Sequence, residues 1–294
     1  MPSALKYLTL VKSLREQLSE NSENSIQNIV QSLSWNDSVY RTFNEGLRLA
    51  TSKRRKQRIP KTLVKYIHIA HVSYTVIALR KLYEEKKKGA YSVNSIRTIT
   101  RRIADNIHLF TRENYLTHDK IPYKCSPNLY WKTKLIVEGR HNKFDLLSRF
   151  NPRSTRKPND RIDPLIVNSL HRHAVLRGEI YQFANKFLTH ASAIGNRPDE
   201  KLTFENLTLN KIQTQYRNVI WAVQQIAKIV DVAVLTQVPV PNYDVLTDWE
   251  NGLFDDAIKS KLHGYWETRM HWWRKWTDYY RNSTVIFLSP RKQI

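Results

Sequence analysis

The segment that ends at His190 holds residue types suited to chemistry on a phosphodiester. Asn185, Lys186 and His190 lie close together, and Lys186 and His190, four residues apart, share one face of a helix. An imidazole moves a proton near neutral pH while a neighbouring cation holds phosphate oxygens. The spacing therefore predicts a catalytic set acting on RNA. Two alternatives stay open: His190 binds RNA without cutting it, or it only caps a helix end, where histidine is favourable.

The charge of the chain also points to a polyanionic partner. Lys and Arg number 48 against 26 Asp and Glu, a net charge of +22 over 294 residues. Residues 51–161 hold 27 of the basic and 8 of the acidic side chains, so nearly all the excess lies in the middle third. This pattern is typical of nucleic-acid binding. The alternative is solubility together with an anionic ligand or an acidic partner.

Basic residues of this middle third form the expected RNA-binding surface. One run of cations follows residue 51, two arginines lie opposite the apolar face of an expected helix, and a turn-rich basic loop covers 149–161 and is expected to stay mobile. A solvated loop is the alternative for the first run. The RNA-binding residues predicted from these patterns are Lys53, Arg54, Arg55, Lys56, Arg97, Arg101, Arg153, Arg156 and Lys157.

The sequence lacks the signatures of several enzyme classes. It has no Gly-rich phosphate loop and no G-x-S-x-G segment. The single cysteine, Cys125, excludes an internal disulfide and any zinc site built on cysteine pairs. His68 and His71 lack further ligands at zinc spacing, so we interpret them as hydrogen-bonded core residues or groove-facing polar residues. We expect no metal and no cofactor.

No membrane or export segment is evident in the sequence. No uninterrupted apolar run reaches the length of about 18 residues that a spanning helix needs, and the first residues lack the apolar core and cleavage site of a signal peptide. We therefore expect a cytoplasmic protein with no membrane partner.

Apolar residues recur at helical spacing through most of the chain, which predicts an all-α fold. Segment 61–85 is apolar nearly all round and is expected to be the buried central helix of a bundle. Ser92 and Asp163 are expected N-caps, the latter followed by Pro164 at the first helical position. The expected helices cover residues 4–18, 61–85, 92–110, 131–149, 163–187, 203–235 and 248–280.

Three parts are expected along the chain. Residues 1–34 form an N-terminal helical segment, 35–243 a helical bundle with a long basic insertion at 111–162, and 244–294 a Trp-rich helical segment. The tryptophans of the last part are spaced by three, four and seven residues, which favours core or dimer packing over base stacking.

Several short segments, taken in order, resemble the HEPN-like AbiU family of phage abortive-infection proteins. The resemblance covers about residues 35–235 and rests on the order of the motifs. Those motifs are Ala78-Leu-Arg80-Lys-Leu82, then Tyr91-Ser-Val-Asn-Ser-Ile96 with the amphipathic helix after it, then Thr111-Arg-Glu113, and finally a long helix ending in Asn185 to His190.

The resemblance implies a helical bundle with additions at both ends, a homodimer, and a metal-independent ribonuclease site of the form R-x(4–6)-H. His190 matches the motif histidine and Asn185 the polar residue after the arginine. The arginine itself falls on Ala184, so Lys186, or the more distant Arg177, would have to supply the cation. Arg112 also matches the family and joins the RNA-binding set, with a structural ion pair as its alternative role.

We therefore expect a HEPN-like RNA-binding protein of phage-defence type, with RNase activity dependent on a substitute for the missing arginine. One alternative is a non-enzymatic interaction protein, antitoxin-like or scaffolding, that assembles with a partner protein. Another is a DNA-binding regulator that uses the same basic surface, ranked last because no helix-turn-helix is evident.

Overall fold

The computed structural model describes residues 3–19, 24–50, 59–84, 94–124, 126, 130–148, 156–176, 178–184, 207–234, 254 and 256–282. Regular structure in these ranges is helical, apart from an isolated β-bridge between Thr111 and Arg161, so the predicted all-α fold is confirmed. The helices are α1 (Ser3–Ser19), α2 (Ile26–Leu49), α4 (Lys61–Tyr83), α5 (Ile96–Asp105), the 3₁₀ helix η1 (Ile107–Leu109), α6 (Arg112–Thr117), α7 (Trp131–Ser148), α8 (Pro164–His173), α9 (Glu179–Phe183), α10 (Leu209–Ile229) and α11 (Asp256–Asn282).

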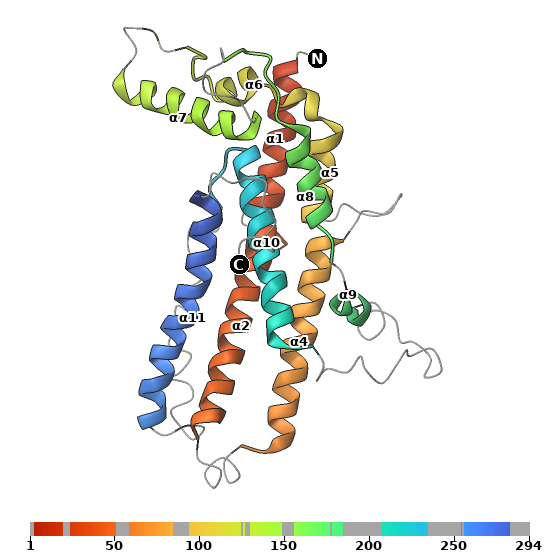
Figure 1. Ribbon diagram of the computed structural model, residues 1–294, viewed down its shortest axis with the longest axis vertical. Helices are drawn as coiled ribbons and strands as arrows, with labels where there is room; N and C mark the ends of the chain where they lie inside the picture. Colours follow the sequence, from red (N-terminus) through yellow and green to blue (C-terminus); the bar gives the residue numbers. More distant parts are fainter. Residues whose placement is uncertain are drawn as a thin grey trace.

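The helices form an elongated bundle (Figure 1). Helices α1 and α2 follow one another along its long axis, and α4 is continued in the same way by α5. Helix α11 packs against α2 and α10, and α8 packs against α5. Helices α6 and α7 contact each other at one end, where α7 crosses the bundle and projects from it (Figure 1).

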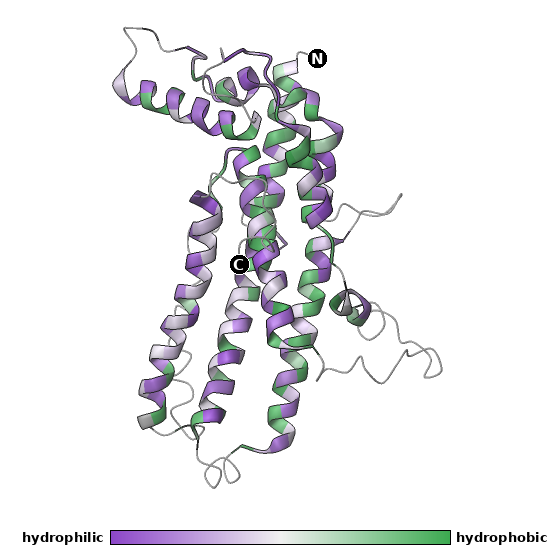
Figure 2. Ribbon diagram, viewed as in Figure 1, coloured by the Kyte–Doolittle hydropathy of each residue, from purple (hydrophilic) through white to green (hydrophobic). Residues whose placement is uncertain are grey.

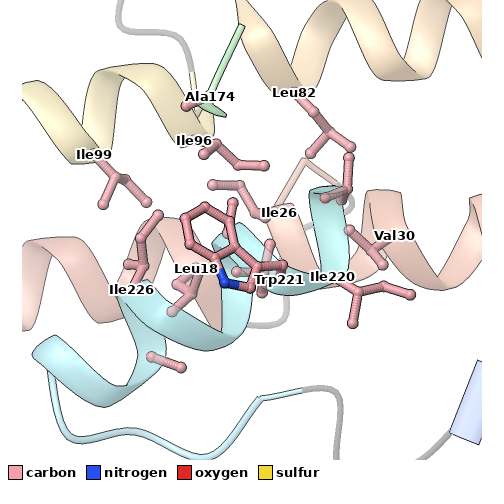
Figure 3. Packing of buried hydrophobic residues seen from close by; sticks show 14 of the residues in the cluster. Leu18, Ile26, Val30, Leu82, Ile96, Ile99, Ala174, Ile220, Trp221 and Ile226 are labelled. Atoms are coloured by element: carbon pink, nitrogen blue, oxygen red, sulfur yellow. The ribbon is translucent and has the colours of Figure 1, made fainter. Parts of the chain in front are cut away.

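The central helix of the bundle is α10, and the expectation that segment 61–85 holds this place is wrong. Helix α10 contacts α2, α4, α5, α8 and α11. Its Trp221 is 1% exposed and is surrounded by apolar side chains from several helices (Figure 3). Those labelled around it include Leu18, Ile26, Ile96, Ile99, Ala174 and Ile226.

Helix α4 is buried only in its second half, from His71 onward. Although much of the helix is apolar (Figure 2), its first half and one side of the second half face outward. The exposed large residues of this helix are Leu63, Tyr66, Tyr74 and Ile77, which we call the α4 stripe. An all-round apolar sequence therefore indicated a helix correctly but did not indicate how much of it the bundle covers.

Side chains at several helix starts fix where these helices begin. The Asp163 carboxylate accepts a hydrogen bond from the backbone N–H of Leu165 at 2.8 Å, which confirms the predicted cap of α8. The cap of α5 is Ser95, whose Oγ accepts from the N–H of Thr98 at 3.1 Å. The predicted cap, Ser92, lies outside the described residues.

Two predicted helices are shorter in the structure. The segment expected at 163–187 breaks after His173, and Gly178, with φ 69°, opens the short helix α9. Helix α10 ends at Ile229, ahead of the predicted stop at Pro239, because Asp231 adopts φ 50°. The N–H of Val232 then bonds to the carbonyl of Ala227 at 3.0 Å, which is the Schellman pattern of helix termination.

One hydrophobic cluster takes residues from all three predicted parts. It includes Leu14 of α1, Val76 of α4 and Trp273 of α11. Helix α2 also runs through positions 34 and 35 without interruption. A smaller cluster, built on Phe43, Leu47, Ile59, Phe254 and Leu262, closes the end of the bundle opposite α7.

Candidate functional site

The predicted catalytic residues Asn185, Lys186 and His190 lie outside the described residues, as does Arg177. The described chain reaches Ala184 at the end of α9, where the family motif places its arginine. Ala184 is 1% exposed and belongs to the main hydrophobic cluster. This position is therefore a packing position in this chain.

The predicted RNA-binding cations fall into different environments. Lys53 to Lys56 and Arg153 lie outside the described residues. On α5, Arg101 is exposed and Arg97 is half-buried. Arg156 and Lys157 belong to a segment that lies beside α6 and α7, and Lys157 is exposed there.

Arg112, predicted as an RNA-binding residue, does not face solvent in the structure. Its side chain is fully buried, and its Nε donates to the Asp160 carboxylate at 3.0 Å. A second carboxylate, that of Asp145, lies 2.7 Å from Nη1, and the guanidinium stacks over the Phe144 ring at 4.8 Å. The structural ion pair, left open as the alternative, is the role that the structure shows.

The segment 156–161, which we call the strap, is fixed to the bundle end. Its backbone carbonyls at Asp160 and Pro158 accept from the N–H groups of Arg112 and Glu113 at 2.8 and 3.0 Å. Arg156 of the strap binds α7 through ion pairs of 2.8 Å to Glu138 and to Asp145. The strap, the described part of the loop 149–161 that was expected to be mobile, is therefore held by these contacts, and residues 149–155 lie outside the described residues.

Ion pairs also neutralise other carboxylates of the α6–α7 unit, which we define as residues 112–148 with the strap. Arg140 pairs with Asp119 at 2.5 Å and with Asp231 at 3.3 Å. The hydrogen bond from Arg140 is the main reason that the pKa of Asp119 is lowered. The exposed cations of this unit are Lys120, Lys124, Lys132, Lys143, Lys157 and Arg161. Most of the acidic groups of the unit therefore pair with cations of the same unit, while several other cations face solvent.

Exposed aromatic side chains lie beside these cations at the start of α7. Tyr130 and Trp131 are 59% and 58% exposed, and their rings contact each other at 5.8 Å. The Lys132 ammonium lies 5.5 Å from the Trp131 ring centre. Leu135 and Ile136 continue the exposed apolar surface, because α7 buries mainly Val137, His141, Phe144 and Leu147. Sequence reasoning missed this surface; its signal was the run Tyr130-Trp-Lys-Thr-Lys134, two aromatics followed by two lysines.

A hollow of about 450 Å³ lies beside α7, where it meets the ends of α10 and α11. Lys143, Lys228 and Arg281 line it, together with Asp231, whose carboxylate pairs with Lys143 at 3.0 Å. Burial lowers the pKa of Lys228 to about 8. This hollow adds cations to the surface that the α6–α7 unit presents.

A second group of polar residues lies inside the bundle and includes the two histidines of α4. Asn36 Nδ2 donates to His71 Nδ1 at 3.0 Å, and the Tyr40 ring stacks on the His71 ring at 3.9 Å. Tyr40 Oη lies 2.5 Å from Nδ1 of His68. Burial is the main cause that lowers the pKa of His71 to about 4, so this imidazole is neutral at pH 7. The interpretation of His68 and His71 as hydrogen-bonded residues is confirmed.

Next to His71, a buried carboxylate joins two helices. Asp37 is fully buried, and it pairs with Arg41 at 2.8 Å and with Arg269 of α11 at 2.6 Å. Arg269 also lies 4.8 Å over the ring of Trp272. This ion triad shows that part of the Trp-rich helix packs in the bundle rather than forming a separate module.

The described residues contain no group of three His, Cys, Asp or Glu side chains placed to hold a metal ion. His173, of the second histidine pair, bonds through Nδ1 to the Ser169 carbonyl at 2.7 Å and packs edge-on against Trp221.

Helix α4 is the one described helix whose length and hydropathy reach those of a membrane span, and 33% of its apolar window is buried. Length and composition alone do not distinguish such a helix from the core helix of a bundle.

Comparisons of the chain with protein-family models, with curated proteins and with solved structures find no match. The resemblance to the HEPN-like AbiU family therefore stays a prediction from the sequence.

Proposed function

We propose that this chain is an RNA-binding protein and that the α6–α7 unit is part of its contact surface. The observation that carries the proposal is the exposed pair Tyr130 and Trp131 with Lys132 beside it. Aromatic faces stack on unpaired bases while lysines neutralise phosphates, which is the usual chemistry of single-stranded nucleic-acid recognition. Single-stranded RNA is favoured over a duplex, because the bases of a duplex are already stacked.

The charge balance supports the same proposal. The chain carries a net charge of +22, and carboxylates near α7, those of Asp119, Asp145, Asp160 and Asp231, are paired with cations inside the structure. The exposed lysines of the unit therefore act on an approaching polyanion with little competition from neighbouring acids.

Binding is tested with a labelled single-stranded RNA and a duplex DNA of equal length, between about 50 and 200 mM salt. We expect tighter binding to the RNA and a steep loss of affinity with salt. Replacing Lys132 and Lys157 by Gln should lower the slope of log K against log salt by about 0.7 for each phosphate that the variant no longer neutralises. The matched control is Lys261→Gln on α11, at the opposite end of the bundle. Binding that is insensitive to salt contradicts the proposal, and a preference for duplex DNA favours the DNA-binding regulator.

The finer proposal is a phage-defence protein of HEPN-like type that cleaves RNA without a metal, using His190, Lys186 and Asn185. It rests on the resemblance and on the side-by-side placement of a histidine and a cation in the sequence. The test is cleavage of mixed cellular RNA in EDTA by the wild type, His190→Ala and Lys186→Ala. Cleavage that both substitutions abolish supports this site, and intact RNA with the wild type contradicts it.

A second candidate function is assembly with a protein, either another copy of this chain or a different partner. The observation that favours it is the α4 stripe, whose members are 39% to 69% exposed. Large apolar side chains that gather on one exposed helix face are typical of protein contact surfaces. The oligomeric state of stripe variants tests this candidate.

A further inference from the structure

A groove of about 470 Å³ lies along the first half of α2, and none of its described lining residues belongs to the α6–α7 unit. Most of its lining comes from one face of α2, since the residues fall at spacings of three, four, seven and eight after the first. Helix α4 contributes one exposed ring. The lining residues are Asn28, Gln31, Ser32, Trp35, Asn36 and Tyr74. This volume lies in the range of small-molecule sites.

The chemistry of the lining restricts what the groove can hold. Its described lining has two aromatic rings, three carboxamides and two hydroxyls, those of Ser32 and Tyr74, and includes no charged or aliphatic side chain. A metal ion would lack carboxylates, a phosphate would lack cations, and an apolar peptide would meet mostly polar groups. A nucleobase matches the lining, because it offers a π-face for the rings and a donor–acceptor edge for the amides.

One amide is held in place by the bundle interior. Asn36 Nδ2 directs its two hydrogens inward, to His71 Nδ1 at 3.0 Å and to Thr75 Oγ1 at 3.4 Å. The Nδ1 atom of His71 is the acceptor because an amide nitrogen only donates, and stacking on Tyr40 holds the imidazole ring in place. Oδ1 of Asn36 is then left to accept from a ligand in the groove. An acceptor of this kind suits the exocyclic amine of adenine or cytosine.

The two rings differ in their freedom. Trp35 packs edge-on against Trp266 of α11 at 5.5 Å, so one ring of the groove is supported by a third helix. Tyr74, in contrast, is 43% exposed. A supported ring and an exposed one suit stacking of a flat ligand, the first as a fixed platform and the second as a ring that can adjust to it.

We infer that this groove binds a single nucleobase, supplied either by a free nucleotide or by an unstacked position of RNA. In the second case the inference rests on the proposed RNA-binding function. Recognition is of the base, since the residues described around the groove include no cation for the phosphate, and bases with an exocyclic amine are preferred through Asn36.

The test is calorimetric titration of the full chain with AMP, CMP, UMP and ribose 5-phosphate, the last of which has no base. We expect AMP and CMP to bind at least about tenfold more tightly than ribose 5-phosphate. Removing one stacking ring with Tyr74→Ala should weaken AMP binding by about tenfold. Tyr181→Ala on α9, where the side chain is also exposed, is the matched control and should leave AMP binding unchanged.

A second measurement, the affinity of the same variants for single-stranded RNA, distinguishes the two sources of the base. If free nucleotides do not bind, but Tyr74→Ala lowers the affinity for single-stranded RNA about tenfold without changing the salt slope, the base comes from RNA. The inference is overturned if ribose 5-phosphate binds as well as AMP, or if Tyr74→Ala and Tyr181→Ala behave alike in both arms. Absence of RNA binding by the wild type, with AMP binding intact, contradicts the proposed function but not the groove.

Discussion

The Nε atom of Arg112 donates to Oδ2 of Asp160 across 3.0 Å, which ties the first residue of α6 to the strap. Because the same guanidinium also pairs with Asp145 of α7, one buried cation joins three segments of the α6–α7 unit. The surface proposed to bind RNA therefore depends on a residue whose own side chain is fully buried.

Arg112→Gln is expected to lower the free energy of unfolding by about 3–5 kcal/mol, because it removes a buried cation, leaves the Asp160 carboxylate without its ion pair and leaves Asp145 with Arg156 alone. Urea unfolding measures this loss of stability. Where the variant is folded, the salt slope of RNA binding should equal that of the wild type, since the buried guanidinium neutralises no phosphate.

Lys132→Gln is the matched control for Arg112. Lys132 is exposed, so its substitution should change stability by less than about 0.5 kcal/mol while lowering the salt slope by about 0.7. If Arg112→Gln lowers the salt slope and leaves stability unchanged, the structural role of Arg112 is contradicted.

Much of the fold follows from local rules that the sequence displays. The face of α1 formed by Tyr7, Val11, Leu14 and Leu18 is buried as its spacing indicates. Asp163 caps α8 because a short acidic side chain ahead of Pro164 matches the free N–H groups of a helix start. Each of these features depends on residues close together in the chain.

Features that depend on residues far apart in the sequence could not be predicted from these local rules. The partners of Arg112 are 33 and 48 positions away, and Arg269 meets Asp37 across 232 positions. Helix α10 ends at Ile229, just before the left-handed Asp231, although apolar residues continue beyond that point. Hydrophobic periodicity could not predict this end, because it carries no information on the backbone conformation of a single residue. Periodicity also could not indicate that α4 leaves its stripe uncovered, since coverage depends on which helices pack beside it.

Stability should fall in mild acid because of His71. Its folded-state pKa of about 4 lies below the ordinary value of 6.5, so the unfolded chain binds the proton more readily. The stabilisation is complete near neutral pH and is lost as pH falls from about 6.5 towards about 4, by roughly 3 kcal/mol in total. Comparing wild type with His71→Gln in urea unfolding at several pH values isolates this contribution. His171→Gln, on an exposed position of α8, is the control; an equal pH dependence in the wild type and His71→Gln contradicts the prediction.

Two glycines of similar helical context should respond oppositely to alanine. At Gly139 of α7 an added Cβ meets nothing within 4 Å, so Gly139→Ala should stabilise the protein by about 0.5–1 kcal/mol through helix propensity. At Gly46 of α2 the added Cβ overlaps the ring of Phe254, so Gly46→Ala should destabilise by about 1–3 kcal/mol. Thermal and urea unfolding measure both changes. A stabilising Gly46→Ala would show that the Phe254 ring does not pack against α2.

The role of the α4 stripe in assembly can be tested with variants that place charges on it. Tyr66 and Ile77 are 69% and 51% exposed, so replacing both by Lys should cost little stability in the isolated chain. If the stripe forms a contact between copies, the wild type should be a dimer in light scattering, and the double variant a monomer with an unchanged circular dichroism spectrum. The control is Leu135→Lys on α7, which is 64% exposed and lies away from the stripe. A dimer that survives the double variant places the contact elsewhere. A wild type that is monomeric alone, but captures a protein that the double variant does not, assigns the stripe to a different partner.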